Sequence, residues 1–118
     1  MKHLNTLLTG LLLASVASTA LAQSDYPNKP VKIISPFPAG GTSDVMARLI
    51  ADELTKALKQ PFIVDNRGGA GGTIGTEAGA KSAPDGYTLI QTGVGQNAVA
   101  HGLNPKLGYD SLKDFIHI

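Results

Sequence analysis

Three glycine-rich loops, each of which follows a short and largely apolar run, constrain the fold of this chain more than any other feature of its sequence. The apolar runs span residues 31–35, 62–64 and 87–91, a length typical of β-strands. Helix-compatible segments follow the loops, and strands that alternate with helices pair in parallel through right-handed crossovers. Loops that leave the carboxyl ends of parallel strands gather along one edge of the sheet. The sequence therefore predicts an α/β fold with a parallel sheet and flanking helices.

The first glycine loop, residues 35–44, reads Ser-Pro-Phe-Pro-Ala-Gly-Gly-Thr-Ser-Asp and precedes an amphipathic segment at residues 45–58. The first N–H groups of a helix have no partner within it, and the helix dipole makes them attractive to anions. Gly40 and Gly41 carry no side chain that would keep a ligand from the backbone. No lysine follows them, so the loop is not a phosphate-binding P-loop. We predict that it binds a carboxylate or another small anion through its backbone.

The helices and the last strand are predicted from spacing and capping residues. Thr42 or Ser43 is the expected cap of the first helix, whose apolar stripe comprises Met46, Ile50 and Leu54, joined by Val45, Leu49 and Leu58. Thr73 is the expected cap of a shorter helix that ends near residue 81. Asp110 is the expected cap of a last turn, and residues 115–118 are expected to begin a fourth strand.

The first 22 residues have the three parts of an export signal. Lys2 and His3 form a basic start, residues 7–17 are largely apolar, and Ala20-Leu21-Ala22 is an A-x-A cleavage site. The apolar run is too short for a membrane-spanning helix, which needs about 20 residues. We therefore expect a signal peptide at residues 1–22, a mature chain that begins at residue 23, and a location in the periplasm.

Charge and motif patterns argue against several classes of function. The formal net charge of +1 falls to zero when Lys2 leaves with the signal peptide, which argues against nucleic acid as a partner. Residues 93–98 match the spacing of a dinucleotide fingerprint, but they follow the third apolar run rather than the first. His101 and His117 have no metal-ligand neighbours at suitable spacing, and no serine lies in a G-x-S-x-G setting. We therefore expect no cofactor, no metal and no catalysis.

Several residues keep two interpretations. The second and third glycine loops, residues 68–72 and 92–97, are either ligand-binding segments or simple turns. Asp44 is either a carboxylate that stabilises the start of a helix or a ligand contact. Arg67 either pairs with an acidic residue or reaches toward an anion. The alternatives differ in what each group contacts once the chain is folded.

Short motifs that occur in order over nearly all of residues 26–118 carry a resemblance to a known family. They are Tyr26-Pro-x-Lys-Pro-Val31, Pro36-Phe-Pro-Ala-Gly-Gly-x-x-Asp44, Val64-x-Asn-Arg67, Gly69-Ala-Gly-Gly72, Ala83-Pro-Asp-Gly-Tyr-Thr88, Pro105-x-Leu-x-Tyr-Asp110 and Lys113-Asp-Phe115. In these motifs the chain resembles the Bug family, the TctC-type periplasmic receptors of tripartite tricarboxylate transporters. The resemblance implies a periplasmic-binding-protein-like, two-lobed Venus-flytrap fold. It also implies a small carboxylate ligand, bound between the lobes, and membrane components of a transporter as partners.

The family holds its ligand largely through backbone groups and ordered waters at three loops, which correspond here to residues 37–44, 69–73 and 92–97. Residues 94–97 depart from the family pattern, because they read Val-Gly-Gln-Asn where small hydroxyl residues, glycine and often histidine are usual. The longer amides donate and accept hydrogen bonds and can change which ligand fits. The resemblance thus assigns ligand binding to Phe37, Ala39, Gly40, Gly41, Thr42, Asp44, Gly71, Gly72, Gly95, Gln96 and Asn97.

Family members are much longer than this chain. The resemblance therefore implies that residues 23–118 are the N-terminal part of lobe 1, in a truncated form whose function is impaired. Two alternatives stay open: an exported enzyme whose catalytic residues lie in missing sequence, or a remnant that folds poorly and has no function. A second α/β lobe in the continuing reading frame would favour the receptor.

Overall fold

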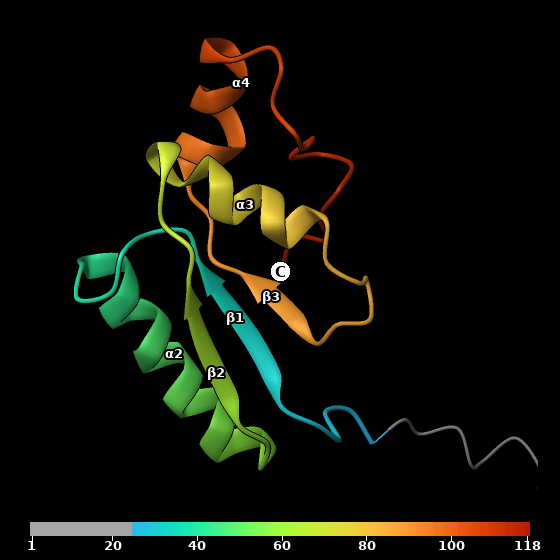
Figure 1. The fold of residues 1–118 in the computed structure, drawn as a ribbon. Helices are drawn as coiled ribbons and strands as arrows, with labels where there is room; N and C mark the ends of the chain where they lie inside the picture. Colours follow the sequence, from blue (N-terminus) through green and yellow to red (C-terminus); the bar gives the residue numbers. More distant parts are fainter. Residues whose placement is uncertain (1–24) are drawn as a thin grey trace, which may run out of the picture.

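The computed structural model describes residues 25–118, in which strands and helices alternate along the chain (Figure 1). The strands are β1 (Val31–Ser35), β2 (Phe62–Asn66) and β3 (Thr88–Ile90). The helices are α2 (Thr42–Leu58), the short 3-10 turn η2 (Ala70–Gly72), α3 (Thr73–Ala80), the π-helix η3 (Gly95–Val99) and α4 (Ala100–Leu103). The expected signal peptide, residues 1–22, lies outside the described residues. Within the described part, no helix is long and apolar enough to cross a membrane.

All three strands are parallel, and β1 lies in the middle of a sheet whose order is β2-β1-β3. Ser35 at the end of β1 pairs with Asn66 at the end of β2, and Ile34 pairs with Ile90 at the end of β3. The strands therefore end at nearly the same level, so that the three glycine loops leave the sheet along one edge. This arrangement confirms the predicted parallel α/β sheet.

Helices cover both faces of this sheet. One face carries a buried cluster in which β1, β2 and α2 meet, formed by Val31, Ile33, Ala47, Ala51 and Phe62. Successive residues of a strand point to opposite faces, so Ile34 and its partner Ile90 lie on the other face. There a Cβ added to Gly79 of α3 would lie 2.7 Å from the Ile90 side chain, so α3 packs directly on β3. The flanking helices thus complete an α/β/α arrangement around a short sheet.

The apolar stripe predicted for α2 is not its buried face. Ala47 and Ala51 lie in the core, and Leu54 is the member of the predicted stripe that packs against it. Met46 and Ile50 are each 46% exposed. The small alanine side chains let α2 lie close to the sheet, which turns the larger side chains outward. We call the resulting outward surface the α2 apolar flank, formed by Val45, Met46, Leu49 and Ile50.

The helix caps also differ from the prediction. The N-cap of α2 is Gly41 in an extended conformation, no side chain caps the helix, and Thr42 and Ser43 lie inside it. α3 likewise has Gly72 as its N-cap, with a φ of 94° that favours glycine. The predicted threonine and serine caps are therefore wrong, because these residues already lie inside the helices and a glycine precedes each helix.

The last part of the chain departs furthest from the prediction. Residues 95–97, expected in a loop, begin the π-helix η3, and residues 115–118 do not form the expected strand. The segment instead folds back over η3, where the hydroxyls of Tyr109 and Ser111 each donate to a carbonyl of η3 at 2.7 Å. Asp110 accepts the N–H of the residue two positions further on at 3.0 Å, which confirms its role at a turn. These bonds hold the segment against a helix rather than a sheet edge.

Candidate functional site

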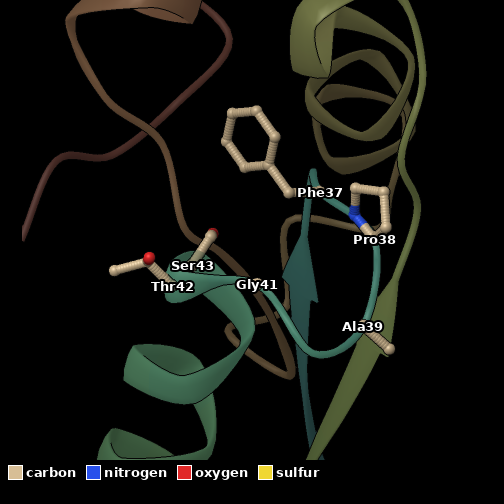
Figure 2. Close-up of a pocket in the computed structure, with 6 residues that line it drawn as sticks. All are labelled: Phe37, Pro38, Ala39, Gly41, Thr42 and Ser43. Atoms are coloured by element: carbon tan, nitrogen blue, oxygen red, sulfur yellow. The ribbon is translucent and has the colours of Figure 1, made fainter.

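The first glycine loop surrounds a hollow of about 380 Å³ at the N-terminal end of α2 (Figure 2). Its lining residues are Phe37, Pro38, Ala39, Gly41, Thr42 and Ser43. In Figure 2 the Phe37 ring and the Ser43 hydroxyl point to the same side of the loop, whereas Ala39 points the other way. All of the lining residues except half-buried Ser43 are exposed. A ligand can therefore reach this loop directly from solution.

Backbone donors at the start of α2 lie in this loop. The first intrahelical bond runs from the Val45 N–H to the Gly41 carbonyl at 3.0 Å. The N–H groups of Thr42 and Ser43 precede it and have no backbone acceptor or capping side chain among the described residues. Unpaired N–H groups at a helix N-terminus, together with the helix dipole, favour a bound anion. The hollow thus combines backbone donors with the apolar surface of Phe37.

Asp44 occupies the centre of a hydrogen-bond network behind the loop. Its buried carboxylate accepts from the Gly40 N–H at 2.9 Å, from the Asn66 amide at 2.9 Å and from the Arg48 guanidinium at 3.0 Å. The hydrogen bond from Arg48, followed by those from Gly40 and Asn66, holds the pKa of Asp44 at about 2. The amide of Asn66 also donates to the Phe37 carbonyl at 3.2 Å. Asp44 is therefore an ionised carboxylate whose partners shape the first loop.

A chain of three polar side chains crosses the ends of β1, α2 and β3. The hydroxyls of Ser35 and Ser43 are 3.3 Å apart, and the Ser43 hydroxyl donates to the Gln91 amide oxygen at 3.2 Å. With Ser43 donating to Gln91, Ser35 donates to Ser43. The individual residues assigned from the sequence do not include Gln91 or Asn66, nor Ser43 and Pro38, although the last two lie in the predicted loop at residues 37–44. The available signal was position, because a polar residue directly after a strand or in the first turn of a helix lies at the sheet edge where the loops meet.

The second and third glycine loops are held together by Gln96. Its side-chain nitrogen donates to the Gly71 carbonyl at 2.7 Å, and its side-chain oxygen accepts the Gly93 N–H at 3.1 Å. Asn97 follows it in η3 and donates to the Thr92 hydroxyl at 3.1 Å. The side-chain oxygen of Asn97 is buried and has no protein partner among the described residues. The second and third loops are therefore connected through the side chain of Gln96.

The first and second loops touch through glycines. A Cβ at Gly75 would lie 2.5 Å from the Arg67 carbonyl oxygen and 2.8 Å from the Cα of Pro36. A Cβ at Gly68 would lie 3.0 Å from the Pro38 ring. The distances at Gly75 are too short for any side chain and the distance at Gly68 leaves little room for one, so α3 and the second loop lie directly against the first loop.

The eleven sequence-predicted residues thus fall into two groups. Those of the first loop lie at or directly behind the hollow, where Gly40 and Asp44 bond to each other. Those of the second and third loops, Gly71, Gly72, Gly95, Gln96 and Asn97, lie on or beside η2 and η3 and do not line the hollow. Gly95 is exposed at the start of η3.

The remaining candidate residues have protein partners. Arg67 pairs with Asp65 at 3.0 Å, the acidic-partner alternative left open by the sequence. His101 accepts the Ser111 N–H at 3.4 Å, and His117 lies 2.8 Å from the Ser111 carbonyl. Within residues 25–118, no cluster of three or more His, Cys, Asp and Glu side chains is arranged to hold a metal ion.

Comparison with known proteins gives consistent matches over most of the chain. A family model described as tripartite tricarboxylate transporter family receptor matches residues 46–118. Protein BugT of Bordetella pertussis is 45% identical over 111 residues, which cover 92% of this chain and 34% of BugT. The chain spans about a third of the length of the curated relatives that it matches.

Two solved structures share the fold and were determined with bound acids. MatC from Rhodopseudomonas palustris, with bound malate, is 44% identical and has a TM-score of 0.72, over 76% of this chain and 31% of MatC. R. palustris Rpa4515, with adipate, is 39% identical and has a TM-score of 0.70, over 74% of this chain and 29% of that protein. The similarity therefore covers both sequence and fold, over the part of these proteins that corresponds to this chain.

Proposed function

Because the chain belongs to the tripartite tricarboxylate transporter receptor family, we propose that it takes part in binding a small carboxylate in the periplasm, for delivery to the membrane components of a transporter. A signal peptide at residues 1–22 would export it. The similar proteins are named as receptors and binding proteins, so the proposed role is binding without catalysis. Residues 23–118 would form the N-terminal part of the first lobe.

The hollow at the start of α2 carries this proposal. Its free donors are the N–H groups of Thr42 and Ser43, which suit a carboxylate, and the Phe37 ring beside them suits a short hydrocarbon chain. Organic acids such as malate and adipate combine these two chemistries, and both are bound by similar proteins. The proposed direct contacts are the Phe37 ring, the Thr42 side chain, and the backbone of Ala39, Gly41 and Thr42.

Asp44 and Gly40 have a supporting role in this proposal. The Gly40 N–H is used by Asp44, so it is not among the free donors of the hollow. The charge of Asp44 is balanced by Arg48, whose guanidinium lies 3.0 Å from the carboxylate. A like charge nearby would disfavour a second carboxylate, and Arg48 reduces that repulsion. Gly71, Gly72, Gly95, Gln96 and Asn97 would form a neighbouring wall of the site.

Titration of the chain with malate and adipate, followed by amide NMR, tests the proposal. Both acids are expected to shift the Thr42 and Ser43 amide signals, because these N–H groups would exchange water for carboxylate oxygen. The neutral diamides of the same acids serve as matched controls and should leave both signals in place. The absence of any shift at these amides with either acid, at concentrations on the order of 10 mM, would contradict the proposal.

A further inference from the structure

The amide of Gln96 is engaged at both ends. Its nitrogen donates to the carbonyl of Gly71, which lies 25 positions away in the sequence, and its oxygen accepts the N–H of Gly93. The residue itself is only 5% exposed, and the two bonds are partly buried, since the glycines that they reach lie at the surface. One side chain therefore connects the backbone of the second glycine loop with that of the third.

The surroundings of Gln96 are fitted to this arrangement. A Cβ at Gly72 would lie 2.5 Å from the Gln96 side-chain nitrogen, so a glycine is required for the amide to reach the second loop. On the other side, the buried Tyr109 hydroxyl donates to the Gln96 carbonyl at 2.7 Å and fixes the backbone of η3. Both the backbone and the amide of Gln96 are thus held in place.

We propose that Gln96 is a positioning residue, which fixes the second loop relative to the third and does not itself contact the bound acid. This inference rests on the proposed function, in which the two loops form a wall of the carboxylate site. Little of Gln96 is open to a ligand, since the residue is only 5% exposed, and a ligand that displaced either bond would release the loop that the bond holds.

Replacing Gln96 by glutamate tests its two hydrogen bonds separately, because the protonation state of the new carboxyl group decides which of them can form. A protonated glutamic acid keeps a donor for Gly71 and an acceptor for Gly93, whereas an ionised carboxylate keeps only the acceptor. Burial raises the pKa of a carboxyl group, so the protonated form of the Gln96→Glu variant is favoured at about pH 4 and is lost toward neutral pH. The pKa of Asp44 is about 2, so the first loop keeps its carboxylate network under both conditions.

Amide hydrogen exchange, measured without ligand, shows how the substitution changes the protection of the two loops. In Gln96→Glu near pH 7, the protection factor of the Gly72 amide, which bonds to the Gly69 carbonyl, should fall about tenfold while Gly93 stays protected. Near pH 4 both amides should return to within about twofold of the wild type. Gln96→Met removes both bonds with little change in volume, so both amides should lose protection at either pH. Gln60→Glu makes the same chemical change outside these loops and should alter neither amide.

Two results would overturn the proposal without reference to any ligand. One is unchanged protection of Gly72 and Gly93 in Gln96→Met, which would show that the amide holds neither loop. The other is an equal loss at pH 4 and pH 7 in Gln96→Glu, which would assign the effect to shape rather than to the donated hydrogen bond. Because Gln96→Met carries no charge at any pH, it decides the first point even where Gln96→Glu fails to fold.

A binding measurement at pH 7 separates positioning from contact. With malate and adipate as probes, Gln96→Met should weaken the binding of both acids by the same factor, within about twofold. The two loops would shift in the same way whichever acid is bound. A loss of affinity for only one of the two acids would show that Gln96 contacts the ligand directly, and would overturn the proposal. Failure of the wild type to bind either acid would count against the proposed function, and the exchange data would still decide the role of Gln96.

Discussion

The side-chain amide of Asn66 donates to the Asp44 carboxylate across 2.9 Å and so ties the end of β2 to the first turn of α2. The same amide reaches the Phe37 carbonyl, so that one side chain connects a strand, a helix and the first glycine loop. Arg48 completes the arrangement by pairing with Asp44 from the next turn of the helix. The shape of the hollow therefore depends on residues that do not line it.

The Asp44 carboxylate should make the fold sensitive to acid. Its hydrogen bonds lower its pKa from 3.8 to about 2. Because the folded-state pKa lies below the unfolded value, Asp44 stabilises the fold above about pH 4, and this contribution is lost as the pH falls toward about 2. Chemical unfolding at about pH 5 and pH 2.5 measures the loss.

Two variants calibrate this measurement. Asp44→Asn should be less stable than the wild type at the higher pH and should lose less stability on acidification, because it has no carboxylate to protonate at this position. Asp52→Asn removes an exposed carboxylate from the same helix and should follow the wild type at both pH values. Identical acid sensitivity of Asp44→Asn and the wild type would contradict the assigned role.

Close packing of α3 on the first loop predicts a strong effect of one methyl group. Gly75→Ala places a Cβ 2.5 Å from the Arg67 carbonyl oxygen, so the free energy of unfolding should fall by about 1–3 kcal/mol. Gly102→Ala is the matched control, since a Cβ there has nothing within 4 Å, and it should be neutral or stabilising by up to about 1 kcal/mol. Urea unfolding of both variants checks the contrast, and equal effects would argue against tight contact at Gly75.

The two adjacent glycines of the first loop should respond differently to substitution. Gly40 has a φ of 84°, so Gly40→Ala is expected to cost about 1–2 kcal/mol through backbone strain, although its Cβ would have nothing within 4 Å. Gly41 has a φ of −83°, so Gly41→Val should keep the fold while its branched side chain obstructs the hollow. Thermal unfolding and malate titration separate the two effects. Unchanged malate affinity in Gly41→Val would remove this loop from the site.

The described chain should bind small carboxylates only weakly. The hollow is open, so each hydrogen bond to a ligand replaces one to water and contributes only about 0.5–1.5 kcal/mol. Two or three such contacts, less the cost of immobilising the ligand, give at best roughly millimolar affinity, about −4 kcal/mol. Calorimetric titration of the folded chain with a panel of carboxylates tests this prediction. A low-micromolar dissociation constant would show that tight binding does not need a second lobe.

Export should remove the first 22 residues. The basic start, the apolar run and the A-x-A site predict cleavage after Ala22. Mass spectrometry of the protein recovered from the periplasm should therefore find Gln23 as the first residue. Ala22→Arg, which disrupts the small residue at the cleavage site, should leave the precursor uncleaved. Periplasmic protein that begins at Met1 would refute the prediction.

The strands and the sheet edge were predictable because they depend on local patterns. Three short apolar runs punctuated by glycine and proline place the three strands and give their direction, and parallel pairing places the loops together. The rotation of α2 was not predictable from its apolar stripe. Ala47 and Ala51 face the core because small side chains allow close approach, and the Asp44–Asn66 contact anchors that orientation.

The site was predictable only where it follows from a single loop. Gly41 and Thr42 could be placed at a helix start from their local sequence, and they do line the hollow. The connection from Gln96 to Gly71 joins residues 25 positions apart, and no local pattern encodes such a contact. Residues 115–118 were expected to begin a strand from their apolar residues, but hydrogen bonds from Tyr109 and Ser111 to η3 hold this end of the chain away from the sheet.

The α2 apolar flank bears on how the protein behaves at high concentration. Four large side chains that neighbour one another at helical spacing remain in contact with water: Val45, Met46, Leu49 and Ile50. Water is released when two such surfaces meet, and salts that are excluded from protein surfaces strengthen this association. The outer side of this helix therefore favours self-association, beside other exposed apolar side chains such as Leu112 and Ile116, and charged substitutions on it would raise solubility while leaving the alanine-packed side untouched.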